Sequence, residues 1–192
     1  RYKKSAQQYC AISQARAQSF PILTTCLPSP LASESSLLTW IGQHTMTTAA
    51  QPIAAKRWVV TQPGAIDNLT LCDVSVAAPS VFEVRVKVHA IGLNFADIFT
   101  VLGLYGDKPP SADHPVTPGF EIAGVVESVG ANASEKFRVG QHVFGLLGTG
   151  GYATAVNVPA SILFNIPEGW TFAQAAAFPV QTLTAYFSLV VL

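Results

Sequence analysis

The side chains best suited to chemistry are an amide and a phenol, Asn94 and Tyr105, near the two ends of one short segment. Residues 90–105 begin with apolar alternation, which favours a strand, and Gly92 offers a turn that residues with a Cβ resist. Asn94 directly precedes a short apolar run, the position from which a side chain caps a helix. The segment ends in Gly-Leu-Tyr-Gly, which predicts an exposed phenol near a second turn. We interpret this strand–turn–helix corner as the lining of an active-site cleft.

The composition predicts a folded, electrically neutral chain. Its 192 residues are enough for one ordinary domain, and 49% hydrophobic against 11% charged residues favours a packed core over disorder. The formal net charge is zero, so no basic surface for nucleic acid is predicted. The three cysteines are scattered and form no Cys-x-x-Cys knuckle, which indicates a reducing compartment.

Residues 1–45 differ in texture from the rest of the chain, because they are rich in Ser, Gln, Ala and Thr and show no sustained period. We interpret them as a disordered extension, or as upstream sequence preceding Met46, the only methionine. An organelle transit peptide is the alternative, since such peptides are Ser-rich and poor in acids. The first interpretation predicts a cytoplasmic protein and the second an organellar one.

From Lys56 onward the pattern is that of a mainly β protein. Residues 83–90 alternate strictly, with Val84, Val86, Val88 and Ala90 predicted on a buried face and Glu83, Arg85, Lys87 and His89 on a solvated one. Further strands are predicted at 57–61, 69–73, 120–129, 141–147 and 152–158. Many short strands with Gly and Pro turns favour a closed or partly closed β-barrel.

The pattern changes to helix at Thr171. Thr171 and Gln174 fit a capping box, and the alanines that follow propagate a helix well. Pro179 should end or kink that helix, before an apolar, helical run from Thr182. The polar residues scattered through residues 173–192 argue against a membrane span.

Several motifs, in order along the chain, resemble the amino-terminal half of the medium-chain dehydrogenase/reductase superfamily, specifically its zinc-free quinone oxidoreductase branch. The motifs are residues 90–97, 103–105, 118–126 with 129–130, 139–143, 150–153, 166–169 and 175–178 with 183–186. The resemblance runs from Lys56 to about Leu189. It implies a GroES-like, partly open β-barrel with short helices, followed by the first helices of a Rossmann domain missing from this chain. We therefore expect a GroES-like catalytic domain at 46–170 and, at 171–192, helices leading into a truncated cofactor-binding domain.

The resemblance also bears on metal and cofactor. Zinc alcohol dehydrogenases of this superfamily carry Cys at the place of Asn94 and His at the place of Phe120. Because zinc needs thiolate, imidazole or carboxylate ligands, an amide and a phenyl ring predict no metal site. The resemblance implies NADPH as the cofactor of a full-length, homodimeric protein. Since no Gly-x-Gly-x-x-Gly opens a helix here, this chain alone is expected to bind the cofactor poorly and to be inactive.

The resemblance assigns roles to four residues. Asn94 would orient the nicotinamide or a substrate carbonyl, beside its simpler role as a helix cap, and Tyr105 would donate a proton. Gln181 and Thr184 would lie beside the nicotinamide ring. Without zinc, Glu121 is expected to be structural.

The function that these expectations favour is hydride transfer from NADPH to a quinone or an α,β-unsaturated carbonyl. The alternatives are an enoyl-thioester reductase of the same superfamily and a non-catalytic GroES-like binding module. The first two would act on small molecules, and no nucleic acid is predicted as a partner.

Overall fold

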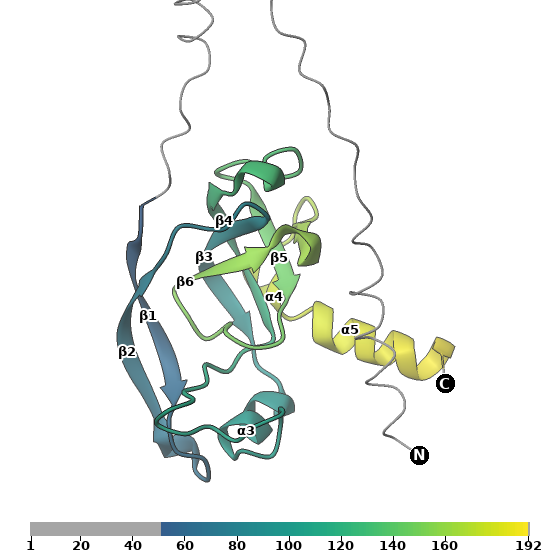
Figure 1. The fold of residues 1–192 in the computed structure, drawn as a ribbon. Coiled ribbons are helices and arrows are strands. Elements are labelled where there is room, and N and C mark those ends of the chain that lie inside the picture. Colours follow the sequence, from purple (N-terminus) through teal and green to yellow (C-terminus); the bar gives the residue numbers. More distant parts are fainter. Residues whose placement is uncertain (1–50, 192) are drawn as a thin grey trace, which may run out of the picture. The chain divides into compact units, whose positions relative to one another are not determined.

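Figure 1 shows a computed structural model of the protein, which describes residues 51–191. The interpretation of residues 1–45 falls outside the described part. The strands are β1 (Ile53–Val60), β2 (Leu69–Val76), β3 (Glu83–Gly92), β4 (Glu121–Val129), β5 (His142–Leu146), β6 (Ala155–Pro159) and β7 (Leu163–Asn165). The α-helices are α3 (Phe95–Val101), α4 (Phe172–Ala176) and α5 (Pro179–Tyr186). Short 3-10 turns occur at η2 (Ile66–Asn68), η3 (Ala131–Ala133) and η4 (Ala160–Ile162), and a π-turn, η5 (Phe187–Val191), follows α5.

The strands form two antiparallel sheets (Figure 1). The larger sheet has the order β6-β3-β4-β5-β7, and the smaller one pairs β1 with β2. Isolated bridges join Arg57 to Ala153 and Val60 to Val116, so β1 also touches the segments beside the larger sheet. Within residues 51–191 the sheets do not close into a continuous barrel. The predicted mainly β, partly open architecture is confirmed.

The main core lies against the larger sheet and contains the apolar face predicted for β3. Val84 and Val86 are fully buried and pack with Ile122, Phe137 and Leu163. The opposite face of β3 is less solvated than predicted, because Arg85 is only 4% exposed. Its guanidinium donates to the backbone oxygen of Gln51 at 2.8 Å and pairs with Glu127 at 3.2 Å. The prediction of a wet Arg85 is therefore wrong, since the chain before β1 covers that side chain.

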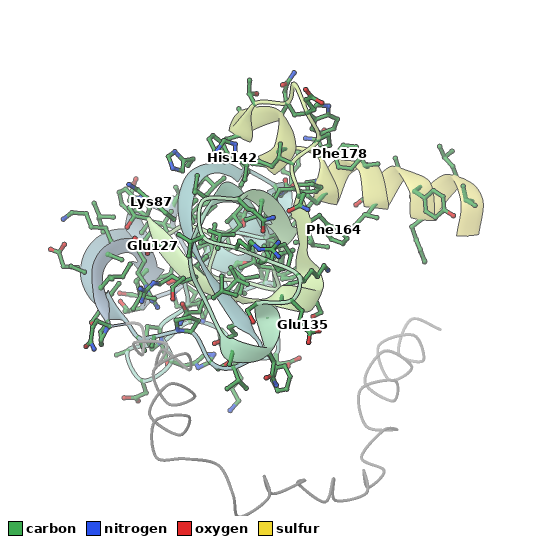
Figure 2. The ribbon with its side chains drawn as sticks, turned by 90° about the horizontal axis from the view of Figure 1, so that it is seen from above. Lys87, Glu127, Glu135, His142, Phe164 and Phe178 are labelled. Carbon is green, nitrogen blue, oxygen red and sulfur yellow. The ribbon has the colours of Figure 1, made fainter. Side chains whose placement is uncertain are left out.

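The short helix α4 covers one side of the larger sheet, and α5 follows it and extends away from the sheet with its residues after Val180 exposed (Figure 1). Thr171 and Gln174 form the predicted capping box at the start of α4, and Ala175 and Ala176 pack against Ala123 of β4. Alanines permit this close approach because they carry little side-chain volume. Helix α4 ends before Pro179, as predicted. Pro179 is the first residue of α5, a position where a backbone N–H would have no partner within the helix. Figure 2 shows Phe164 and Phe178 close to the start of α5, and both rings contact Phe144.

Candidate active site

A buried glutamate at the start of β4 connects the segments that hold most of the predicted site residues. Glu121 is fully shielded from solvent. Its Oε1 accepts a hydrogen bond from Nδ2 of Asn94 at 2.9 Å, and its Oε2 accepts one from the backbone N–H of Val180 at 2.8 Å. Val180 lies in the first turn of α5, where backbone N–H groups have no partner within the helix. Glu121 thus fixes the start of α3 relative to the start of α5.

The lack of a side chain at Gly92 makes room for Glu121 and does not serve a turn. The residue stays within β3 and pairs directly with Glu121, so the predicted turn at Gly92 is wrong. A Cβ placed on Gly92 would overlap Cγ, Cδ and Oε1 of Glu121. The missing side chain leaves the space that the buried glutamate occupies.

Asn94 is the N-cap of α3, as the sequence predicted. Its backbone is extended, and it forms a capping box with Asp97, whose Oδ2 accepts from the N–H of Asn94 at 2.8 Å. The side-chain amide meanwhile donates one N–H to Glu121, which leaves its second N–H for another partner. The cap and a contact role are therefore compatible in one residue.

Asp97 has a second set of partners that the sequence did not reveal. The side chain is buried, and its Oδ1 accepts from the backbone N–H of Gly119 at 2.9 Å. Tyr152 also hydrogen-bonds to this carboxylate, and burial, reinforced by the negative charge of Asp97, raises the pKa of the Tyr152 hydroxyl. Tyr152 consequently keeps its proton and serves as a donor. The sequence alone indicates that Asp97, an acid in the first turn of a helix, can take part in a helix cap. It does not reveal the contacts of Asp97 with Gly119 and Tyr152, which are distant in the sequence.

Tyr105 follows the turn that ends α3. The N–H groups of Gly103 and Leu104 bond back to the carbonyls of Thr100 and Phe99, and Gly103 has φ +73°, which together make a Schellman ending. Tyr105 is 50% exposed, and its ring makes a T-shaped contact with the Phe120 ring with centroids 5.4 Å apart. Since Phe120 precedes Glu121, the phenol lies beside the segment that holds Asn94.

The two predicted residues of α5 are solvent-exposed. Gln181 directly follows Val180, so the Glu121 contact brings it toward the Asn94 segment. Thr184 lies one turn further along the same face of the helix. Glu121 thus connects the Asn94 segment to the start of α5, where Gln181 lies, and Phe120, the residue before Glu121, contacts Tyr105. Thr184 is connected to these residues only by its position on α5.

An open pocket adjoins Tyr105. Its volume is about 620 Å³, and its walls come from β1, the end of α3, residues 105–117 and the loop at 148–150. That volume falls in the range of small-molecule sites, about 300–1,000 Å³. Asn94 does not line this pocket, so the phenol is the predicted catalytic residue that faces it. The sequence analysis did not predict the pocket, because its walls come from four separate segments.

The part of the chain that the structure describes holds no group of three His, Cys, Asp or Glu side chains able to bind a metal ion. The absence of zinc stays a prediction. Two histidines contact the same aromatic ring instead. The His89 ring stacks on Phe172 with centroids 4.7 Å apart, and the His142 ring is tilted against Phe172 with centroids 4.8 Å apart. No helix among residues 51–191 has the length and apolar character needed to cross a membrane.

Comparison with known proteins agrees with this geometry. Residues 81–168 match the family described as the alcohol dehydrogenase GroES-like domain. A synaptic vesicle membrane protein VAT-1 homolog from Danio rerio is 45% identical over 107 residues, which are 56% of this chain and 21% of that protein. The crystal structure of Escherichia coli quinone oxidoreductase complexed with NADPH superposes with a TM-score of 0.64 and 32% identity, covering 70% of this chain and 40% of that one. The CurK enoyl reductase superposes with a TM-score of 0.66 and 30% identity, covering 72% and 43%.

The fold and the matched residues define a GroES-like domain of the alcohol dehydrogenase type. With the relatives above, the chain belongs to the medium-chain dehydrogenase/reductase superfamily, as the amino-terminal part of its quinone oxidoreductase and enoyl reductase branch. The resemblance drawn from the sequence motifs is thereby confirmed. The chain spans less than half the length of these relatives.

Proposed function

We propose that this chain is the amino-terminal part of an NADPH-dependent oxidoreductase that transfers hydride to a quinone or an α,β-unsaturated carbonyl without zinc. The observation that carries the proposal is the Glu121 bridge. It holds the Asn94 amide beside the start of α5, next to the phenyl ring that contacts Tyr105. The similarity to a quinone oxidoreductase complexed with NADPH supports the cofactor. In this proposal residues 46–170 contribute the catalytic side chains, and residues 171–192 begin the cofactor-binding part.

The polar groups of the site fit a nicotinamide carboxamide. The remaining N–H of Asn94 can donate to its oxygen, and the exposed amide of Gln181 and hydroxyl of Thr184 offer both donors and acceptors. NADPH, when bound, supplies the hydride. The task of Asn94 and α5 is to orient the ring against the acceptor, and the buried Glu121 keeps both in place.

Tyr105 supplies the proton side of the reaction. Hydride adds to the electron-poor carbon of the acceptor, and the electron pair of its double bond moves onto the carbonyl oxygen. A phenol hydrogen-bonded to that oxygen stabilises the charge as it develops and then transfers its proton, which gives an enol. With a quinone, the carbon that received the hydride then loses a proton and the second carbonyl oxygen gains one, and this tautomerisation gives the hydroquinone. Because Tyr105 is half exposed, water can return the proton to the phenolate.

The test is the NADPH consumption of the complete gene product with quinones and enones. Tyr105→Phe should lower the rate of enone reduction roughly ten-fold or more. Ser161→Ala, which removes an exposed hydroxyl outside both the pocket and residues 171–192, is the control and should leave the rate unchanged. Equal turnover by the Tyr105 variant and the wild type would remove Tyr105 from the mechanism. No NADPH consumption with any acceptor would contradict the proposed function and favour a binding module.

The second candidate is reduction of an enoyl thioester, which the similarity to CurK enoyl reductase favours. The two substrates share the conjugated carbonyl, so the same residues would act. A crotonyl thioester assayed beside a quinone distinguishes them, because the preferred substrate shows the higher kcat/KM.

A further inference from the structure

The pocket beside Tyr105 has a charge pattern that the proposed reaction does not use. Its lining includes two basic side chains, Arg57 and Lys108, together with His114, against one acid, Asp107. No ion pair joins any of these four residues within the described part of the chain. Elsewhere in that part, Lys56 is paired with Asp73 and Arg85 with Glu127. Two of the basic side chains that have no ion pair in the described residues, Arg57 and Lys108, thus lie at the same cavity, whereas Lys87, Lys136 and Arg138 lie outside it.

Arg57 is the least hydrated of these charges. Its side chain lies on β1 at the wall of the pocket, and its Nε is buried without a hydrogen-bond partner. A buried N–H without a partner is unfavourable, and such a group in a native structure requires an explanation. A guanidinium held in this way gains more from a nearby anion than a fully solvated lysine does, because less water must be displaced.

The neighbours of Arg57 are suited to an oxyanion. The pocket lining also contains two threonines, Thr117 and Thr149, which carry hydroxyl groups, and Lys108 adds a second cation. An arginine binds a carboxylate through two parallel N–H···O bonds, which fix the direction of the bound group. Tyr105 lies in the lining of the same cavity. An acidic group held by Arg57 would therefore belong to a molecule that also reaches the phenol.

We propose that this pocket binds an oxyanion, carboxylate or phosphate, carried by the substrate, so that the enzyme acts on acidic quinones or enones. The inference rests on the proposed function for the reacting end of the molecule. The binding of the acidic end is independent of hydride transfer and can be measured without turnover. Within the pocket Arg57 is the binding residue, and Lys108 adds long-range attraction.

The probes are a naphthoquinone that carries a propionate side chain and its methyl ester, titrated into the complete gene product by calorimetry. The acid should bind at least about ten-fold more tightly than the ester, as expected for a hydrogen bond to a charged group. Arg57→Gln should bring the ratio of the two dissociation constants close to one, and Lys108→Gln should reduce it by a smaller factor. Arg138→Gln removes the same charge from an exposed site outside the pocket and should leave the ratio unchanged.

Each further outcome has one meaning. Equal binding of acid and ester by the wild-type protein overturns the inference, whether or not the enzyme consumes NADPH. A second contrary outcome is that the acid and the ester bind equally well while adenosine 2′-monophosphate binds tightly and Arg57→Gln abolishes that binding. This result would assign the anion site to the cofactor and would also overturn the inference. An enzyme that consumes no NADPH but binds the acid selectively would contradict the proposed function and leave the pocket inference standing. Thermal unfolding of each variant identifies any that fails to fold, and Lys108→Gln, on an exposed segment, then serves in place of Arg57→Gln.

Discussion

Replacing Gly92 by alanine tests the packing of the site in the most quantitative way. The added methyl group would overlap the Glu121 side chain, which is fully buried and held by two hydrogen bonds. Because the glutamate must move, the variant weakens the contacts to Asn94 and Val180. Overpacking costs about 1–3 kcal/mol, and each hydrogen bond to a charged group contributes about 1.5–3 kcal/mol. We expect Gly92→Ala to lower the free energy of unfolding by about 3–5 kcal/mol, since partial rearrangement retains part of these contacts.

A double-mutant cycle separates this mechanism from a general effect of the new methyl group. Glu121→Ala by itself leaves the two donors unpaired and should cost about 2–4 kcal/mol. In the double variant the hydrogen bonds are lost only once and the overlap disappears, so the double variant should cost about as much as Glu121→Ala alone, and the total should fall short of the sum of the single effects by about 3–5 kcal/mol. The assay is urea unfolding followed by circular dichroism.

Gly148→Ala is the matched control. A Cβ at Gly148 meets nothing within 4 Å, and no positive φ is recorded there, so its effect should stay within about 0.5 kcal/mol. If Gly92→Ala were as mild as Gly148→Ala, or if the two single effects simply added, the arrangement around Glu121 would be refuted.

Three other predictions concern the hydroxyl of Tyr152, the helix cap at Thr171 and the absence of zinc. Burial and the Asp97 charge raise the pKa of Tyr152 above its ordinary value of 10.0, so the contribution of Tyr152 to stability is complete below pH 10 and is lost at higher pH. Tyr152→Phe should therefore reduce the loss of unfolding free energy above pH 10, measured by denaturant unfolding at a series of pH values. An unchanged pH dependence would contradict this role of Tyr152. Thr171→Ala removes the side chain that accepts from the N–H of Gln174 and should cost about 1 kcal/mol, whereas Thr171→Ser should retain most of that stability. Metal analysis of the purified protein should find no tightly held zinc, and about one zinc per chain would refute the metal-free interpretation.

The local parts of the fold were predictable from the sequence. The capping box at Thr171, the helix beginning after Asn94 and the apolar face of β3 each depend on neighbours within a few residues, which the sequence displays directly. The strand β7 was missed because its three residues are too short for a period to show.

The contacts of the site were harder to predict because they join segments far apart in the sequence. Glu121 meets Val180, and Asp97 meets Gly119 and Tyr152, across the fold. One signal was available for the first of these: Glu121 directly precedes the apolar run 122–126, and an acid in such a strand must find partners if it faces inward. Gly92 shows the opposite case, since a glycine in sequence does not reveal whether it permits a turn or makes room for a neighbour.

In the proposed reaction, organic donors and not a metal ion support hydride transfer. The measurement that tests this proposal is the NADPH-dependent reduction of a quinone by the complete gene product after exhaustive treatment with a chelator. If organic donors alone act, the rate should be the same before and after treatment and should stay the same when zinc is added back. A rate that falls on chelation and returns with zinc would contradict it.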